Sequence, residues 1–275
     1  MKPQLLPILK CDPSEIGRLK TRLDRFYHDV TDYTAFSAPS DQVHCWKHIA
    51  DHIRQLSKNG RQVRVLEVGA GRSGFGTYLT RQNLREKCVW TAQDVTSQSS
   101  DWLEANADKF IHGDIETTAI DEVQDIIFST YVLEHVVSPA THLDSLLKVV
   151  NLASGKIFIF CPRYDLPCYM TPSSRHLSKL TKLSFMMTAS LARIRTIFTG
   201  HPSFLVQNDL AAFHQPFFTD ADAVHWVSLF DLRAWALANN GEFETLRIGN
   251  PSVLSKDWIV KRMLTVGISV EFGSR

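Results

Sequence analysis

Apolar residues recur at helical spacing in the first part of this 275-residue chain. The segment Asp12-Pro13-Ser14-Glu15 is typical of a helix start, with a capping carboxylate, a proline in the first turn and a glutamate three residues after the cap. A second helix is predicted after Ser40, because Trp46, Ile49 and Ile53 fall on one helical face. Gly60 is placed to end it.

After Gln62 the pattern changes to short, dense apolar runs separated by helical patterns such as Leu143–Val150. These runs are Val63–Val68, Val89–Ala92, Phe110–Ile111, Ile126–Phe128 and Ile157–Phe160. Strands that alternate with helices indicate βαβ units and a mostly parallel sheet.

The alternation stops after Pro162 and resumes with a predicted helix at Leu229–Ala238 and strands at Phe243–Ile248 and Leu264–Val270. We therefore expect three parts in the chain. They are an N-terminal helical extension or lid (1–61), an α/β core (62–162 and 217–275) and an insertion (163–216).

Composition excludes several classes of protein. Hydrophobic residues at 44% and charged residues at 21% are ordinary for a globular protein, and a net charge of +1 argues against a chain-wide nucleic-acid surface. No apolar run reaches the ~20 residues that span a bilayer. Five cysteines without metal-ligand spacing indicate reduced thiols, so we expect a cytoplasmic protein.

The segment Val65–Gly74 is a strand followed by a glycine-rich turn into a helix. Such a turn lets a ligand approach main-chain N–H groups, but nicotinamide and flavin enzymes share it. Glu67 would repel a pyrophosphate and suits a cationic amino-acid group. Asp94, at the end of the second strand, can bind ribose hydroxyls, and Gly113-Asp114-Ile115 suits the amino edge and face of an adenine.

Together these motifs resemble the class I S-adenosylmethionine-dependent methyltransferases. The resemblance also includes Asp125–Val136, which is similar to the family's fourth motif, and Ala153–Lys156, which is similar to the turn into strand five. It implies a Rossmann-like α/β fold with helices on both faces of a seven-stranded, mostly parallel sheet whose last strand is antiparallel. It also implies S-adenosylmethionine as cofactor.

The resemblance assigns the cofactor-binding residues by position. It places Glu67, Gly69, Ala70 and Gly71 at the methionine end, Asp94 at the ribose, Asp114 and Ile115 at the adenine, and Ser129 and Thr130 at the sulfur side. Arg72 departs from the small or polar residue common at its place. It would contact the cofactor carboxylate or point to solvent.

A hydroxyl acceptor needs a base, and a histidine is the natural candidate. His135, shortly after the fourth strand, is the predicted catalytic base, with helix capping or packing as the alternative. His214, His225 and Tyr27 are predicted to line the substrate site, and Tyr33 could belong with Tyr27 to a lid.

The insertion has no Asp or Glu between Asp165 and Asp209. It carries the basic residues Arg175, Lys179, Lys182, Arg193 and Arg195 and an apolar helical face of Leu180, Leu183, Met187, Leu191, Ile194 and Phe198. Three interpretations are open for this basic amphipathic segment, which we expect to cover the acceptor site. It packs its apolar face on the domain, recognises an anionic acceptor, or makes a peripheral membrane contact near a lipid-linked acceptor.

We therefore predict methyl transfer from S-adenosylmethionine to a hydroxyl of a small molecule or glycan, by in-line displacement. No metal is expected, because no carboxylate and histidine cluster stands out, and no nucleic acid, because the basic segment lacks interleaved aromatics. The alternatives are an N- or C-methyltransferase, a nicotinamide-dependent oxidoreductase and a catalytically silent cofactor-binding regulator.

Overall fold

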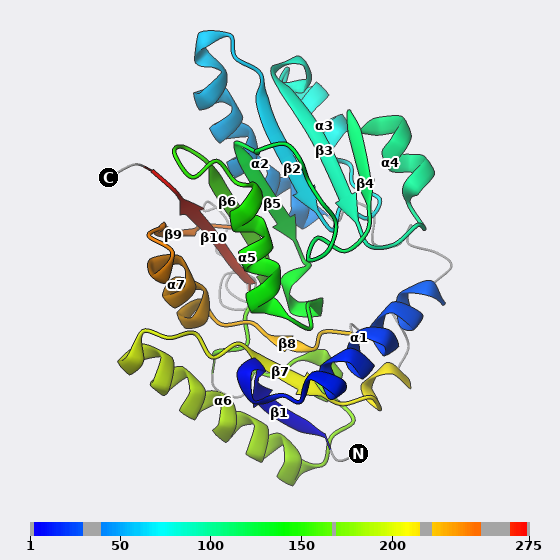
Figure 1. The fold of residues 1–275 in the computed structure, drawn as a ribbon, viewed down its shortest axis with the longest axis vertical. Coiled ribbons are helices and arrows are strands. Elements are labelled where there is room, and N and C mark those ends of the chain that lie inside the picture. The colour runs from blue at the N-terminus through cyan, green and yellow to red at the C-terminus, as the bar shows by residue number, and fades with distance from the viewer. Residues whose placement is uncertain (1–2, 30–39, 167–168, 215–221, 249–264, 274–275) are drawn as a thin grey trace. The chain divides into compact units, whose positions relative to one another are not determined.

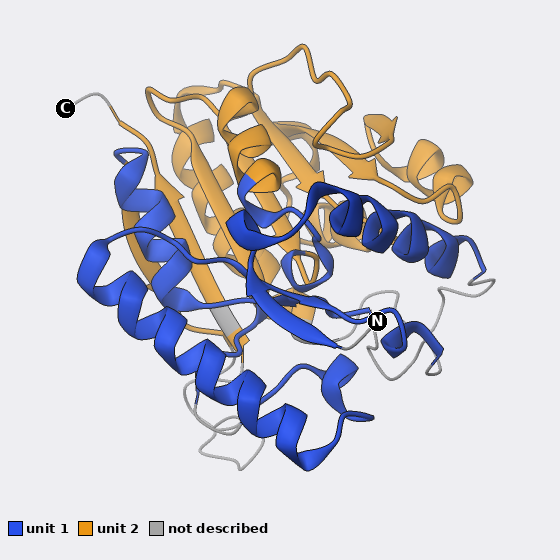
Figure 2. Cartoon of the chain, turned by 60° about the horizontal axis from the view of Figure 1, so that its bottom comes forward, with its two compact units in different colours: residues 1–30, 133–140, 161–240 blue, residues 31–132, 141–160, 241–275 orange. Residues whose placement is uncertain are grey.

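The computed structural model describes residues 3–29, 40–166, 169–214, 222–248 and 265–273. The chain forms two compact units, shown in Figure 2. Unit 1 comprises residues 1–30, 133–140 and 161–240, and unit 2 comprises residues 31–132, 141–160 and 241–275. Each unit has a sheet of its own, with three strands in unit 1 and seven in unit 2 among the residues described.

The sheet of unit 2 has the strand order β4-β3-β2-β5-β6-β10-β9. Its strands are β2 (Val63–Val68), β3 (Cys88–Asp94), β4 (Lys109–His112), β5 (Ile126–Thr130), β6 (Lys156–Pro162), β9 (Glu242–Leu246) and β10 (Thr265–Glu271). The pairs β2–β3, β2–β5, β3–β4 and β5–β6 are parallel, whereas β10 pairs antiparallel with β9. The predicted mostly parallel seven-stranded α/β sheet is thus confirmed.

Helices cover this sheet because its central strands are apolar on both faces. They are α2 (Ser40–Leu56), α3 (Phe75–Arg81), α4 (Ser100–Asn106) and α5 (Pro139–Val149), with short 3-10 turns η3 (Ser57–Asn59) and η4 (Arg85–Lys87). Leu66 and Ile127 are as fully buried as their strand neighbours Val65 and Phe128, so both faces are packed.

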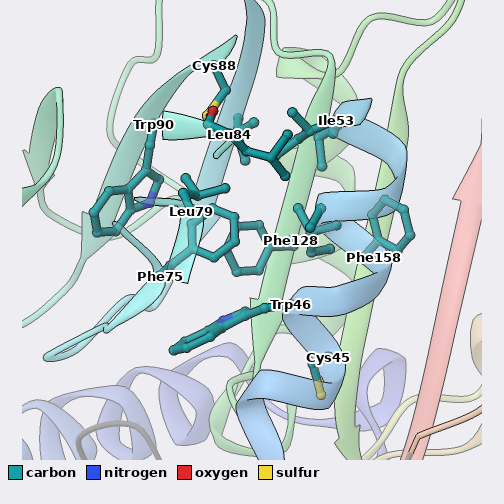
Figure 3. Close-up of a cluster of buried hydrophobic side chains, with 14 of the residues drawn as sticks. Cys45, Trp46, Ile53, Phe75, Leu79, Leu84, Cys88, Trp90, Phe128 and Phe158 are labelled. Carbon is teal, nitrogen blue, oxygen red and sulfur yellow. The ribbon is translucent and has the colours of Figure 1, made fainter. Parts of the chain in front are cut away.

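One core cluster joins α2 and α3 to this sheet (Figure 3). Trp46 and Ile53 of α2 pack with Phe75 of α3 and with Phe128 and Phe158 of the sheet. The rings of Phe75 and Phe128 meet edge to face with centroids 4.8 Å apart. The glycine-rich turn between β2 and α3 is therefore anchored at both ends by buried side chains.

Unit 1 is built on a small antiparallel sheet that the sequence analysis did not predict. Its strands are β1 (Gln4–Pro7), β7 (Leu205–Asn208) and β8 (His225–Trp226), in the order β1-β7-β8. Its helices are α1 (Pro13–His28), α6 (Lys179–Thr199) and α7 (Leu229–Ala238), with 3-10 turns η1 (Ile8–Lys10), η5 (Leu133–His135), η6 (Pro172–Ser174) and η7 (Ala212–His214). Figure 1 shows β1 between β7 and α6.

The ends of the helices follow local sequence signals. Oδ1 of Asp12 accepts a hydrogen bond from the backbone N–H of Ser14 at 2.7 Å, which confirms the predicted start of α1. Gly60 adopts a left-handed conformation (φ 75°) after α2 and η3, as its predicted role as a helix end requires. Within the described ranges, no helix is long and apolar enough to cross a membrane.

The basic amphipathic segment forms the long helix α6, but its orientation differs from the first interpretation. The apolar face does not pack on the domain, because Leu180, Leu191 and Phe198 are exposed. Arg193, which the sequence placed among the surface charges, is instead buried beside Asp231. Helical periodicity locates a stripe of side chains but does not determine which stripe the tertiary structure buries.

Candidate active site

The glycine-rich turn after β2 needs glycine at two positions. Gly69 has φ 64°, and a Cβ placed on it would lie 2.5 Å from Cγ2 of Val132. Gly71 has φ 54°, and a Cβ there would meet nothing within 4 Å among the described atoms. The first glycine therefore permits a close approach within the protein. The second adjoins space that is open among the described atoms.

Asp94 lies at the carboxyl end of β3 and contacts this turn directly. Its Oδ2 accepts a hydrogen bond from the N–H of Gly71 at 2.6 Å. Its Oδ1 accepts from the backbone N–H and the hydroxyl of Thr96 at 2.7 Å and 2.8 Å. Burial raises the pKa of Asp94 although these hydrogen bonds lower it. The carboxylate is thus fixed in position beside the turn.

Glu67 is held inside the protein by two donors. Its Oε1 accepts from the hydroxyl of Ser73 at 2.9 Å, and its Oε2 accepts from Nε1 of Trp90 at 3.1 Å. The hydroxyl of Ser73 also accepts a hydrogen bond from the N–H of Phe75, the first residue of α3, at 3.1 Å. Burial raises the pKa of Glu67 to about 8. These contacts make Glu67 a support of the glycine turn.

Gln93 connects the turn after β2 with the turn after β4. Its Oε1 accepts from the N–H of Gly69 at 3.2 Å, and its Nε2 donates to the carbonyl oxygen of Gly113. The N–H of Gly113 in turn donates to the carbonyl oxygen of Asp94 at 2.9 Å. The turns that carry the predicted methionine, ribose and adenine residues are therefore linked through one buried amide.

The remaining predicted cofactor residues lie in the same unit. Asp114 is partly buried, with Oδ1 accepting from the N–H of Glu116 at 2.9 Å, and Ile115 is buried beside it in the chain. Ser129 and Thr130 end β5 as buried residues, and Ser129 pairs with Val68. The residues predicted to bind the cofactor thus lie in or directly after strands β2 to β5 of the sheet.

Arg72 makes a contact that the sequence did not indicate. Its exposed guanidinium lies over the ring of Trp102, 4.8 Å from the ring centroid. Nε1 of Trp102 donates to the carbonyl oxygen of Ser73 at 3.0 Å. This stacking holds the side chain against the protein surface beside the glycine turn.

In unit 1, His135 and Tyr27 meet at one carboxylate. Nδ1 of His135 lies 3.0 Å from Oδ2 of Asp222, and the hydroxyl of Tyr27 donates to the same oxygen at 2.8 Å. Nε2 of His135 lies 3.8 Å from Oε1 of Glu134. The structure therefore brings together two residues that the sequence analysis had proposed separately.

The pKa of Asp222 lies below its ordinary value even though burial raises it. The charge of His135 and the hydrogen bonds from His135 and Tyr27 outweigh the effect of burial. Asp222 is therefore a carboxylate at neutral pH, and it fixes the orientation of the imidazole by holding Nδ1.

The other two histidines occupy different environments. His225 is fully buried, and its Nδ1 donates to the carbonyl oxygen of Leu133 at 2.9 Å. It thus supports η5, the turn that carries His135. His214 is exposed on η7, and no contact in the described part of unit 1 joins it to Asp222.

Asp222 and Gln93 are the site residues that sequence analysis missed. Asp222 lies in a run of acidic and aromatic residues that has no motif spacing. Gln93 belongs to no recognised motif, whereas the neighbouring Asp94 does. Tyr33 and the segment 217–220, which the sequence analysis also considered, lie outside the described residues. No group of three or more His, Cys, Asp or Glu side chains that could hold a metal occurs in the part of the chain covered by the structure.

Comparisons with known proteins agree with this architecture. Residues 66–159 match a family model described as a methyltransferase domain. The chain is similar in structure to the plantazolicin methyltransferase BpumL (TM-score 0.56, 12% identity, covering 96% of this chain and 100% of that one). It is also similar to Burkholderia thailandensis 1,6-didemethyltoxoflavin-N1-methyltransferase (TM-score 0.52, 13% identity, 96% and 92%).

A third similar structure is the CurJ carbon methyltransferase, with a TM-score of 0.52 and 11% identity over 96% of this chain and 62% of that one. No match was found among curated proteins. The strand order, the glycine turn and the carboxylates at the strand ends define a Rossmann-like nucleotide-binding fold. With the domain match, they confirm the prediction of a class I S-adenosylmethionine-dependent methyltransferase.

Proposed function

We propose that this chain is a cytoplasmic enzyme that methylates a hydroxyl of a small molecule or glycan, with His135 as the general base. The observation that carries this proposal is the pairing of His135 Nδ1 with Asp222 at 3.0 Å. A histidine held in this way by a buried carboxylate is the usual arrangement of a base that takes a proton through its other nitrogen. His135 follows Thr130, the last residue of β5, by five positions in the chain.

The residues of the glycine turn fit the cofactor. Open space adjoins Gly71, and the neighbouring carboxylate of Asp94 is placed to accept hydrogen bonds from ribose hydroxyls. In this proposal the cofactor contacts come from Gly69, Ala70, Gly71, Asp94, Asp114, Ile115, Ser129 and Thr130, while Glu67 holds the turn through Ser73.

When bound, S-adenosylmethionine supplies an activated methyl group on a sulfonium sulfur. With the cofactor bound, His135 would take the proton of the acceptor hydroxyl at Nε2, which would prepare the oxygen to accept the methyl group that the cofactor supplies, with S-adenosylhomocysteine as the leaving group. Asp222 stabilises the resulting imidazolium. General-base assistance of this kind contributes about 10²–10⁴-fold to a rate.

Two of the similar structures support an organic small-molecule acceptor. The plantazolicin methyltransferase was crystallised with a pentazolic desmethylPZN analogue and S-adenosylhomocysteine. The toxoflavin enzyme was crystallised with 1,6-didemethyltoxoflavin and S-adenosylhomocysteine. We propose that Tyr27, His214 and His225 belong to the acceptor side of the site, with His225 acting through η5.

The cofactor is tested by thermal shift with S-adenosylmethionine, S-adenosylhomocysteine and NAD in parallel. A ligand at a hundred times its dissociation constant stabilises the folded protein by ~2.7 kcal/mol. We expect a shift with the two adenosyl compounds and none with NAD. A shift with NAD alone would establish the oxidoreductase alternative instead.

The base is tested with His135→Ala and the matched control His201→Ala, which changes an exposed histidine beyond α6. Transfer of labelled methyl to a panel of alcohols, phenols, sugars and amines identifies the acceptor class. His135→Ala is expected to keep its affinity for S-adenosylhomocysteine and lose most of its turnover. Equal turnover of the two variants, or a product methylated on nitrogen or carbon, would contradict the proposed chemistry.

A further inference from the structure

The helix α6 has one face that packs on unit 1 and one that does not. Phe185, Ala189, Ala192 and Thr196 are buried on the packed face, where α6 contacts α7 and β1. Arg193 lies on the same face, and its guanidinium donates to the carboxylate of Asp231 and to the carbonyl oxygen of Trp226. The orientation of the helix is therefore fixed by both apolar packing and a buried ion pair.

The opposite face of α6 is an exposed apolar stripe. Its six members are 50% to 84% exposed and fall within about a quarter of the helix circumference. They are Leu180, Leu183, Met187, Leu191, Ile194 and Phe198. With Ile197, this one helix carries seven of the fourteen exposed large hydrophobic residues in the described ranges. Monomeric soluble proteins seldom leave so continuous an apolar surface uncovered.

The charged side chains of the segment that carries this stripe are all basic. At 3.6 residues per turn, Lys179 and Arg195 flank the stripe on its two sides, and both are exposed. Arg175, just before the helix, is exposed as well. The chain has no Asp or Glu between Asp165 and Asp209. The stripe is thus bordered by cations with no anion of its own segment to neutralise them.

We propose that α6 binds flat on the surface of an anionic membrane, with its apolar stripe between the headgroups and the acyl chains. The flanking Lys179 and Arg195 would then lie at the depth of the lipid phosphates. α6 is not apolar enough to span a bilayer, so its exposed face suits contact with the membrane surface. This surface function is independent of the reaction proposed above.

A second copy of the chain explains the same face less well. Pairing α6 with α6 would bury the two stripes, but it would bring together helices whose charged side chains are all basic. Like charges without an intervening anion oppose such an interface. Lipid phosphates and carboxylates complement the same charges.

The experiment is flotation of the full chain with phosphatidylcholine vesicles, with and without phosphatidylserine, at low and high salt. The apolar variant combines Leu183→Gln, Leu191→Gln and Phe198→Gln. Its matched control combines Leu9→Gln, Leu152→Gln and Leu237→Gln, three exposed apolar residues outside α6. The charge variant combines Lys179→Gln and Arg195→Gln. Circular dichroism verifies that all variants are folded.

We expect wild type and control to float with the phosphatidylserine vesicles, and the apolar variant to remain in solution. The charge variant is expected to bind more weakly by about fivefold for each charge removed at low salt. Binding that is absent in wild type, or equal in the apolar variant and its control, would overturn the proposal. Sedimentation velocity tests the alternative occupant. If wild type forms a dimer and does not float with vesicles, and the apolar variant is a monomer, the proposal is also overturned, because a second copy would then cover the stripe.

Discussion

Oδ2 of Asp222 lies 3.0 Å from Nδ1 of His135 and so fixes the ring of the proposed base. The hydroxyl of Tyr27 holds the same oxygen at 2.8 Å. The carboxylate is 5% exposed on its side chain, so little water can replace either partner. In the proposed reaction Asp222 acts through His135 and is therefore a positioning residue.

The first prediction concerns Asp222→Asn. An asparagine can preserve the shape of the site but not the charge that stabilises the imidazolium, so kcat is expected to fall by about tenfold or more. KM for the acceptor and affinity for S-adenosylhomocysteine should change little. Tyr27→Phe, which removes only one hydrogen bond to the carboxylate, should have a smaller effect. A rise in KM with kcat unchanged would indicate that Asp222 shapes the acceptor pocket instead.

The second prediction is a pH dependence of stability that originates at Glu67. Its pKa is raised from 4.5 to about 8, so between these values the native state holds a proton that the unfolded state releases. Stability should therefore fall as pH rises through this window, at a limiting slope of about 1.4 kcal/mol per pH unit. Urea unfolding of wild type and Glu67→Gln at several pH values measures it. If the free energy of unfolding changes with pH equally in wild type and in Glu67→Gln, Glu67 does not cause the pH dependence.

The third prediction concerns Gly69→Ala. The added Cβ would lie 2.5 Å from Val132, and the residue would need φ 64°, so we expect a loss of about 1–3 kcal/mol in the free energy of unfolding. Affinity for S-adenosylhomocysteine should fall as well. Gly17→Ala in α1 is the control, since a Cβ there meets nothing within 4 Å and alanine favours the helix. Equal stability of the two variants would contradict the close approach.

The fourth prediction concerns the ion pair that anchors α6. Arg193→Met leaves the carboxylate of Asp231 buried without its cation, which should cost about 3–5 kcal/mol of stability. Arg195→Met, two residues along the same helix, removes an exposed charge and should change stability by less than about 0.5 kcal/mol. Denaturant unfolding distinguishes the two. A small effect at Arg193 would show that apolar packing alone holds the helix.

The elements that local signals determine could be predicted from the sequence. The bounds predicted for β2 and α7 match the structure, because glycines, caps and dense apolar runs mark them. The position of the residues predicted to bind the cofactor, at the ends of consecutive strands, could also be predicted, because their motifs follow dense apolar runs.

Features that depend on distant partners could not be predicted. The two-residue strand His225–Trp226 is too short to show a pattern, and it is paired only through β7. Arg193 looks like any other basic residue until Asp231 is placed beside it, 38 positions later. Asp222 likewise has meaning only through His135 and Tyr27.

The antiparallel pairing of β1 with β7 also constrains the order of folding. Gln4 is registered opposite Asn208, so the first strand has no partner until more than two hundred residues have been synthesised. At ~5–20 residues per second this interval lasts about 10–40 s. The earliest segment of the chain is thus among the last to find its place, and the nascent polypeptide must keep Leu5 and Leu6 out of competing associations throughout that time.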